Sequence, residues 1–143
     1  MEIEVNLKPS REWMGNFAKQ FGAEAQSPNK FHYVDNQSIF RLNSLRFDND
    51  TVILIGDINW SRPLNTLKTP LNTNEYWTLI FIDSEDNHIN YLLSDNKKEE
   101  IRSKRTILMY NSKMLVDTHW PIGKRSRFVS ISFRQEWLQE KLI

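Results

Sequence analysis

The chain has 143 residues, and 19 Lys and Arg against 18 Asp and Glu give a formal net charge of +1. This balance lacks the basic excess of a dedicated nucleic-acid-binding domain. The absence of cysteine excludes a disulfide framework and thiolate chemistry and fits a reducing cytoplasm. The chain has no apolar run of about 20 residues and no secretory signal, so we expect one soluble, cytoplasmic domain that does not enter a membrane.

The N-terminal stretch predicts a strand followed by a helix. Apolar and polar residues alternate over residues 3–7, which is typical of a strand with one buried face. Trp13, Phe17 and Phe21 then recur every four residues and would lie on one stripe of a helix. We therefore predict an amphipathic helix over about residues 10–21 that packs across a sheet.

The sequence pattern in the middle of the chain is typical of a mainly β protein. Short runs rich in β-branched and aromatic residues are separated by Asp- and Asn-rich turns. No helical pattern lies between them, which favours a barrel or sandwich over alternating βαβ units. Strands are predicted over residues 31–34, 38–47, 51–61, 75–84, 88–93, 106–110, 114–118 and 127–133.

Two segments between these strands are predicted to lack regular structure. Residues 64–74, within the run PLNTLKTPLNTN, lie among two prolines and several asparagines and read as a loop crossing between sheets. Residues 97–105, KKEEIRSKR, read as a charged, solvated connector; no aromatic is interleaved to suggest a nucleic-acid patch.

Strand phase indicates which side chains face inward. In residues 51–61 the more apolar phase predicts the interior. That phase comprises Val52, Leu54, Gly56, Ile58 and Trp60. Gly56, in an otherwise bulky strand, suggests a bulge, or a place where a ligand or another backbone approaches closely. In residues 75–84 both phases are apolar, so we expect both faces of that strand to be covered.

A cavity in the barrel would be lined by large side chains from these two strands. Aromatic rings commonly wall small-molecule pockets, and they also fill solid barrels, so both interpretations stay open. The pocket candidates are Ile58, Trp60, Tyr76, Trp77 and Phe81.

No catalytic site is predicted. His32, His88 and His119 stand on separate segments, whereas a divalent metal in a barrel needs three or four converging ligands. The chain has no GxSxG elbow and no glycine-rich phosphate loop. The basic turn at residues 124–127 reads as solvated, although it suits a phosphate or carboxylate. We expect no catalytic residue, no metal and no cofactor.

The C-terminal stretch predicts a helix over about residues 134–142. Leu138 and Leu142, four residues apart, share a face with Trp137 beside them. A helix of about ten residues is marginal alone in water, so this one must pack on its domain or on another chain. It has no capping residue, and we expect a further segment to follow it.

This stretch carries a resemblance to a known family. A hairpin turn with Ile122 and Gly123 leads into the strand RFVSISF, which contributes Val129, Ile131 and Phe133, and then into EWL, which contributes Trp137 and Leu138. The arrangement resembles the junction in AraC/XylS-type bacterial transcription regulators between the ligand-sensing barrel and the connecting helix. The resemblance implies a cupin-like β-barrel (jelly roll). The two helix-turn-helix units of such regulators are absent from residues 1–143.

The sequence hypothesis is therefore an effector-binding and dimerisation domain of an AraC-type regulator, not an enzyme. We expect an unidentified small-molecule effector, a homodimer, and DNA contact only through a following domain. Phe133, Trp137, Leu138 and Leu142 are the candidates for coupling or dimerisation, and Leu138→Asp with Leu142→Asp should change oligomeric state or stability. The alternatives are a stand-alone cupin-like enzyme (isomerase or metal-dependent oxygenase) and a sugar-binding β-sandwich module with exposed Trp60 and Trp77.

Overall fold

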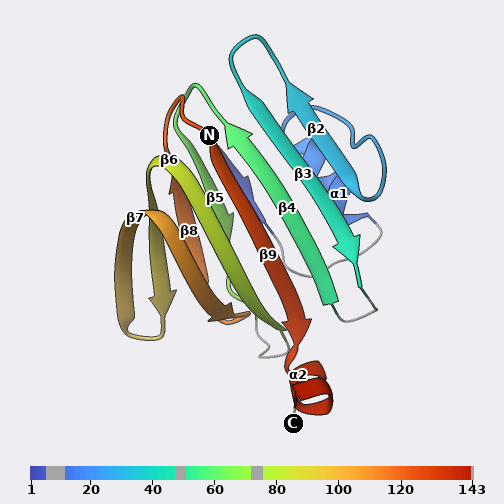
Figure 1. The fold of residues 1–143 in the computed structure, drawn as a ribbon, viewed down its shortest axis with the longest axis vertical. Coiled ribbons are helices and arrows are strands. Elements are labelled where there is room, and N and C mark those ends of the chain that lie inside the picture. Colours follow the sequence, from blue (N-terminus) through green and yellow to red (C-terminus); the bar gives the residue numbers. More distant parts are fainter. Residues whose placement is uncertain (6–11, 48–50, 72–75, 143) are drawn as a thin grey trace.

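The computed structural model describes residues 1–5, 12–47, 51–71 and 76–142, with only the backbone of Leu138, Lys141 and Leu142 (Figure 1). Within these ranges, β-strands dominate and two short helices flank them. The elements are β1 (Glu2–Glu4), α1 (Trp13–Lys19), β2 (Lys30–Val34), β3 (Ile39–Arg46), β4 (Thr51–Asn59), β5 (Leu64–Lys68), β6 (Tyr76–Ser94), β7 (Lys97–Asn111), β8 (Leu115–Trp120), β9 (Ser126–Arg134) and α2 (Gln135–Leu142).

The described strands form one curled sheet. Its order is β1-β5-β8-β6-β9-β4-β3-β2, and β7 pairs with the other edge of β6. All pairs are antiparallel except β1 with β5. β6 is the junction: its first half pairs with β9 and its second half with β8. An irregularity between Asp83 and His88 separates the halves, which run in different directions in Figure 1.

Three predicted boundaries are wrong, each for a physical reason. Residues 64–68 form β5 rather than a loop, because Pro63 and Pro70 lie outside the strand and leave its hydrogen bonds to β8 intact. The charged residues 97–105 belong to β7, an edge strand whose exposed charges do not prevent pairing with β6. The strands predicted over 75–84 and 88–93 are one strand, β6.

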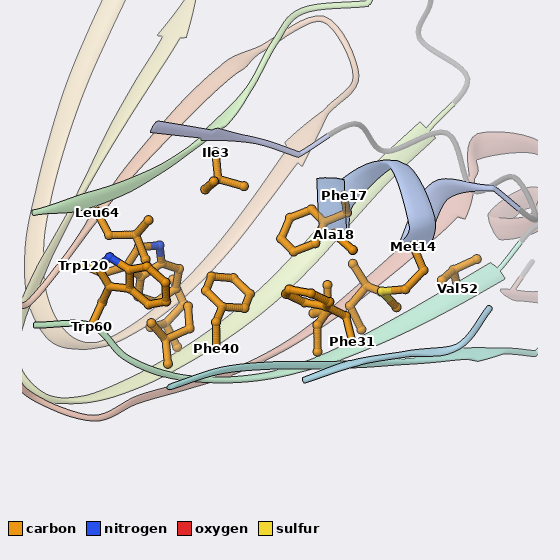
Figure 2. Close-up of a cluster of buried hydrophobic side chains, with 14 residues drawn as sticks. Ile3, Met14, Phe17, Ala18, Phe31, Phe40, Val52, Trp60, Leu64 and Trp120 are labelled. Atoms are coloured by element: carbon orange, nitrogen blue, oxygen red, sulfur yellow. The ribbon is translucent and has the colours of Figure 1, made fainter. Parts of the chain in front are cut away.

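The predicted N-terminal helix is shorter than expected. α1 spans Trp13–Lys19, and the predicted start at residues 10 and 11 lies outside the described residues. α1 packs on the inner side of the curled sheet, where Met14 and Phe17 point toward Phe31 and Phe40 (Figure 2). The rings of Phe17 and Phe31 make an edge-to-face contact, with ring centroids 5.8 Å apart. This aromatic cluster is the main core and holds α1 in place.

The predicted C-terminal helix is confirmed as α2, which follows β9 without a loop. Phe133 at the end of β9 contacts Trp137 of α2, with ring centroids 6.0 Å apart. The side chains of Leu138 and Leu142 lie outside the described ones, so their coupling role stays a prediction. Neither described helix combines the length and apolar character needed to cross a membrane.

The predicted interior phase of β4 is confirmed. Val52, Leu54, Ile58 and the following Trp60 are buried on the inner side, in the same cluster as the α1 aromatics. Gly56 lies directly opposite Phe128 on β9, and a Cβ at Gly56 would sit 2.0 Å from the Phe128 ring. Glycine is therefore required by the close approach of a side-chain ring, whereas a bulge, a ligand or another backbone was predicted.

Candidate functional site

A small cavity lies inside the curl, between α1 and the sheet. It has a volume of about 60 Å³. Apolar side chains form most of its wall, and Trp13 and Phe17 close it on the α1 side. Its lining residues come from both halves of the sheet: Val5, Trp13, Phe17, Phe40, Leu42, Leu54, Thr66, Lys68, Ile80, Tyr110, Val116, Thr118, Trp120, Phe128 and Ser130.

The cavity contains one buried ammonium group, from Lys68 on β5. Its Nζ donates to the backbone carbonyls of Asn111 (3.0 Å), Ser112 (2.7 Å) and Met114. Burial lowers the pKa of Lys68 to about 8. The ammonium also lies 5.8 Å from the ring centre of Tyr110, whose own pKa burial raises. Lys68 therefore fixes the turn between β7 and β8 and adds positive charge to the cavity wall.

A second polar group is buried deeper along the same inner face. His88 is fully buried, and its Nδ1 and Nε2 atoms lie 3.0 Å from the hydroxyls of Ser84 and Thr106. A neutral imidazole has one donor and one acceptor, and two hydroxyls can satisfy both. Burial lowers the pKa of His88 from its ordinary value of 6.5. Burial and the two hydroxyl partners therefore favour the neutral imidazole of His88.

The residues around His88 do not fit a divalent metal. Both ring nitrogens are engaged by hydroxyls, and the neighbouring buried polar groups on the inner face are Asn90 and Thr118 rather than carboxylates. Among the residues that the structure describes, no three His, Asp or Glu side chains gather as a metal site would require. His32 and His119 lie on β2 and β8, and His119 bonds Asp117 at 3.0 Å instead.

β9 links the cavity to the C-terminal helix. Phe128 and Ser130 line the cavity, and the same strand runs through Arg134 into α2. The inner side of β9 carries small hydroxyl side chains; Ser132 lies 3.0 Å from Thr78 of β6, hydroxyl to hydroxyl. A group that pushed on the inner side of β9 would therefore act on the strand that positions α2.

A larger concavity lies on the opposite side of the sheet. This outer groove has a volume of about 940 Å³ and is open to solvent. Its floor is apolar, and charged side chains line one margin. The lining residues are His32, Arg41, Asn43, Ile55, Gly56, Asp57, Phe81, Ile82, Asp83, Arg105, Thr106, Ile107, Arg127, Phe128 and Val129.

The charged margin of the groove is a cross-strand row. The register places Arg41, Asp57, Arg127, Asp83 and Arg105 side by side on β3, β4, β9, β6 and β7. Their signs alternate across the sheet, and Arg105 and Arg127 both lie near Asp83. Neighbours of opposite sign support the register of the sheet, although such exposed pairs each contribute little stability.

The predicted pocket residues do not lie together. Ile58 and Trp60 are buried in the core and line neither of these two concavities. Phe81 lines the outer groove, not the interior, and Tyr76 and Trp77 lie half-buried at the start of β6. Trp60 and Trp77 are on opposite faces of the sheet, so they do not form the paired platform expected of a sugar-binding module.

Sequence reasoning missed the polar groups of the interior. Lys68 falls in the segment predicted as a loop, so its inward position could not be deduced. Ser130 and Thr118 lie in predicted strands, and their phase was the available signal: small hydroxyl residues alternate with apolar ones. Period-2 alternation does not find these residues by itself, because apolar residues usually mark the interior phase.

Comparisons with known proteins establish the fold. No family model matches the chain, and no curated protein matches it. Among solved structures, CapF bound to the inhibitor 3-isopropenyl-tropolone is similar, with a TM-score of 0.51 and 6% identity. That alignment covers 73% of this chain and 30% of the CapF chain.

A second similar structure is a predicted oxalate decarboxylase from Thermotoga maritima. The TM-score is 0.51 and the identity 8%, over 74% of this chain and 92% of the other. At such low identities the likeness shows the fold alone. The chain is a mainly β, cupin-fold domain with a curled half-barrel sheet, and the predicted fold class is confirmed.

Proposed function

We propose that this chain is the effector-binding and dimerisation domain of a bacterial AraC-type transcription regulator, and that it is not an enzyme. One observation carries the proposal: β9 both lines the interior cavity, through Phe128 and Ser130, and continues directly into α2. An effector that binds one arrangement of β9 and α2 better than another would shift their populations. In such a regulator, DNA contact would be made by helix-turn-helix units outside residues 1–143.

The cavity must enlarge to hold an effector of ordinary size. Its volume of about 60 Å³ accommodates roughly two water molecules. We infer that an effector would have to displace α1, which has seven residues and depends on its packing against the sheet. Its C-terminal end is tied to β1, because Gln20 exchanges two hydrogen bonds with the backbone of Glu4. Movement of Trp13 and Phe17 would join the cavity to the space that their rings fill.

The lining indicates the chemistry of the effector. Most of the wall is apolar or aromatic, and the polar side chains in it are those of Lys68, Thr66, Tyr110, Thr118 and Ser130. Such a lining suits a flat or apolar molecule with a few hydrogen-bonding groups.

The test is a small-molecule screen of the purified chain by thermal shift, followed by amide hydrogen exchange. A compound bound in the cavity should raise Tm and change exchange in residues 135–142. Ser130→Phe, which fills the cavity, should abolish the shift, whereas the outer-groove variant Ile107→Lys should retain it. A compound that binds Ser130→Phe equally well, or leaves exchange in α2 unchanged, would contradict the proposal.

The enzyme alternative is separated by metal analysis. Stoichiometric Fe, Mn, Ni or Zn in the purified protein would favour a metal-dependent cupin-like enzyme, whereas the donor set around His88 does not fit such a metal. The coding sequence after Ile143 provides an independent check, since the regulator assignment expects two helix-turn-helix patterns there.

A further inference from the structure

The outer side of the sheet carries an extended apolar surface, here called the outer face. It consists of two cross-strand rows on β3, β4, β9, β6 and β7. One row is Ile55, Val129, Phe81 and Ile107, and the next is Leu45, Ile53, Ile131, Leu79 and Met109. Ile107 is 67% exposed and Leu45 58%. Monomeric proteins rarely expose contiguous apolar patches of this extent, and larger ones mark interaction sites.

The outer face is wide and open, so its shape suits another protein surface better than a small molecule. Small-ligand sites bury most of the ligand surface, whereas here Ile55 and Ile107 on the groove floor remain half or more exposed. The apolar rows also extend past the groove, through Leu45 and Met109. The four strands β4, β9, β6 and β7, each about 4.8 Å wide and roughly 30 Å long, give a face of roughly 600 Å² before side-chain relief. That approaches the ~800 Å² per partner of a stable interface.

The charges beside the apolar rows identify the partner. On the four strands β4, β9, β6 and β7, the row reads Asp57, Arg127, Asp83 and Arg105. Consider two copies whose outer faces stack, with a two-fold axis between the two sheets that runs parallel to the strands above the gap between β9 and β6. This axis places β9 of one copy over β6 of the other, and β4 of one copy over β7 of the other. Arg127 then faces the second copy's Asp83, and Asp57, which within one copy also pairs with Arg125 at 2.8 Å, faces the second copy's Arg105. The alternating row is thus complementary to itself.

The same axis superposes the apolar rows. Val129 then meets the second copy's Phe81, and Ile55 meets the second copy's Ile107. Apolar side chains occupy the middle of the interface and charged ones its margin, which is the usual anatomy of a specific interface. A two-fold contact also needs one self-complementary patch, and this face supplies it.

We propose that the outer face binds a second copy of this chain, the two sheets stacking about a two-fold axis parallel to the strands between β9 and β6. The interface does not involve α2 and does not depend on an effector. It places β9 of both copies at the centre of the dimer, since β9 and β6 flank the axis.

The first test is sedimentation equilibrium over a concentration series. The unaltered chain should be dimeric, and Ile107→Lys should be monomeric with unchanged far-UV circular dichroism, because Ile107 is mostly exposed within one copy. Ile122→Lys is the matched control: Ile122 is also exposed (56%) but lies in the turn after β8. It should remain dimeric.

The second test uses charge. Asp83→Arg places like charges opposite each other and should weaken the dimer at least tenfold, and adding Arg127→Asp should restore it.

The third test is chemical cross-linking, which the absence of native cysteine makes possible. Ile55→Cys with Ile107→Cys should give a covalent dimer with a short bis-maleimide, whereas Ile122→Cys should not.

Three results would overturn the inference. One is an unaltered chain that stays monomeric at every concentration. Another is Ile107→Lys with undiminished dimerisation. The last is a dimer abolished by Leu138→Asp with Leu142→Asp and unaffected by the outer-face variants, which would locate the contact on α2. The first result would also contradict the dimerisation part of the proposed function, but none of them bears on effector binding, which thermal shift and hydrogen exchange test separately.

Discussion

The inner sides of the neighbouring strands β9 and β4 differ, whereas the outer sides of both carry apolar residues. The inner side of β4 carries the core residues Val52, Leu54 and Ile58, as expected of a half-buried strand. The inner side of β9 carries one large ring, Phe128, among buried serines at 126, 130 and 132, while Val129 and Ile131 face outward. The comparison teaches that burial in this sheet is not distributed by hydrophobicity alone. Small polar side chains on β9 leave room inside the barrel, and apolar ones cover the outer face.

The largest expected effect is on the inner side. Phe40 is 1% exposed and its ring contacts Phe17, Phe21 and Trp60. Phe40→Ala should lower the free energy of unfolding by about 3–5 kcal/mol, because it leaves a cavity in the aromatic cluster that holds α1. Urea titration followed by tryptophan fluorescence measures it. A loss under about 1 kcal/mol would show that the cluster is not the core.

A smaller effect is expected where β4 and β9 meet. Gly56→Ala drives a methyl group into the Phe128 ring, so the ring must move toward the interior cavity. Overpacking of this kind costs about 1–3 kcal/mol. Thermal melting of Gly56→Ala beside Gly15→Ala provides the comparison, since a Cβ at Gly15 meets no atom within 4 Å. Equal melting temperatures would mean that Phe128 adjusts freely.

These two positions show what the sequence could predict. The inward phase of β4 and the special role of Gly56 followed from period-2 alternation and from one glycine among bulky residues. The polar interior did not follow, because Ser130 and Thr118 resemble the solvent side of a strand. The exposed outer face was also missed: with both phases of residues 75–84 apolar, we expected both sides to be covered, but Phe81 is 42% exposed. What covers an apolar face depends on pairing between strands far apart in sequence.

The buried His88 makes the inner side sensitive to pH. Its pKa is lowered by burial, so below about pH 6.5 the unfolded chain binds a proton that the folded chain does not. The free energy of unfolding should therefore fall as pH decreases from 6.5 toward the folded-state pKa, by up to about 1.4 kcal/mol per pH unit. Urea titrations between pH 7.5 and 5.5 measure the slope.

His88→Gln is the control for this pH dependence. It keeps a donor and an acceptor for Ser84 and Thr106 but cannot be protonated in this range. Whatever its absolute stability, its slope between pH 7.5 and 5.5 should be flatter than that of the unaltered chain. An unchanged slope would assign the pH dependence to other groups.

The smallest effect on a single copy is expected on the outer face. Phe81→Ala removes a ring that is already 42% exposed, so at low protein concentration it should cost less than about 1 kcal/mol, against the several expected for Phe40→Ala. If the outer face binds a second copy, dimerisation adds stability that rises with concentration. The Tm difference between Phe81→Ala and the unaltered chain should then widen as concentration rises, whereas the Phe40→Ala difference should stay nearly constant. A Phe81→Ala difference independent of concentration would mean that this ring contributes to one copy alone, since mass action requires any contact with a second copy to strengthen with concentration.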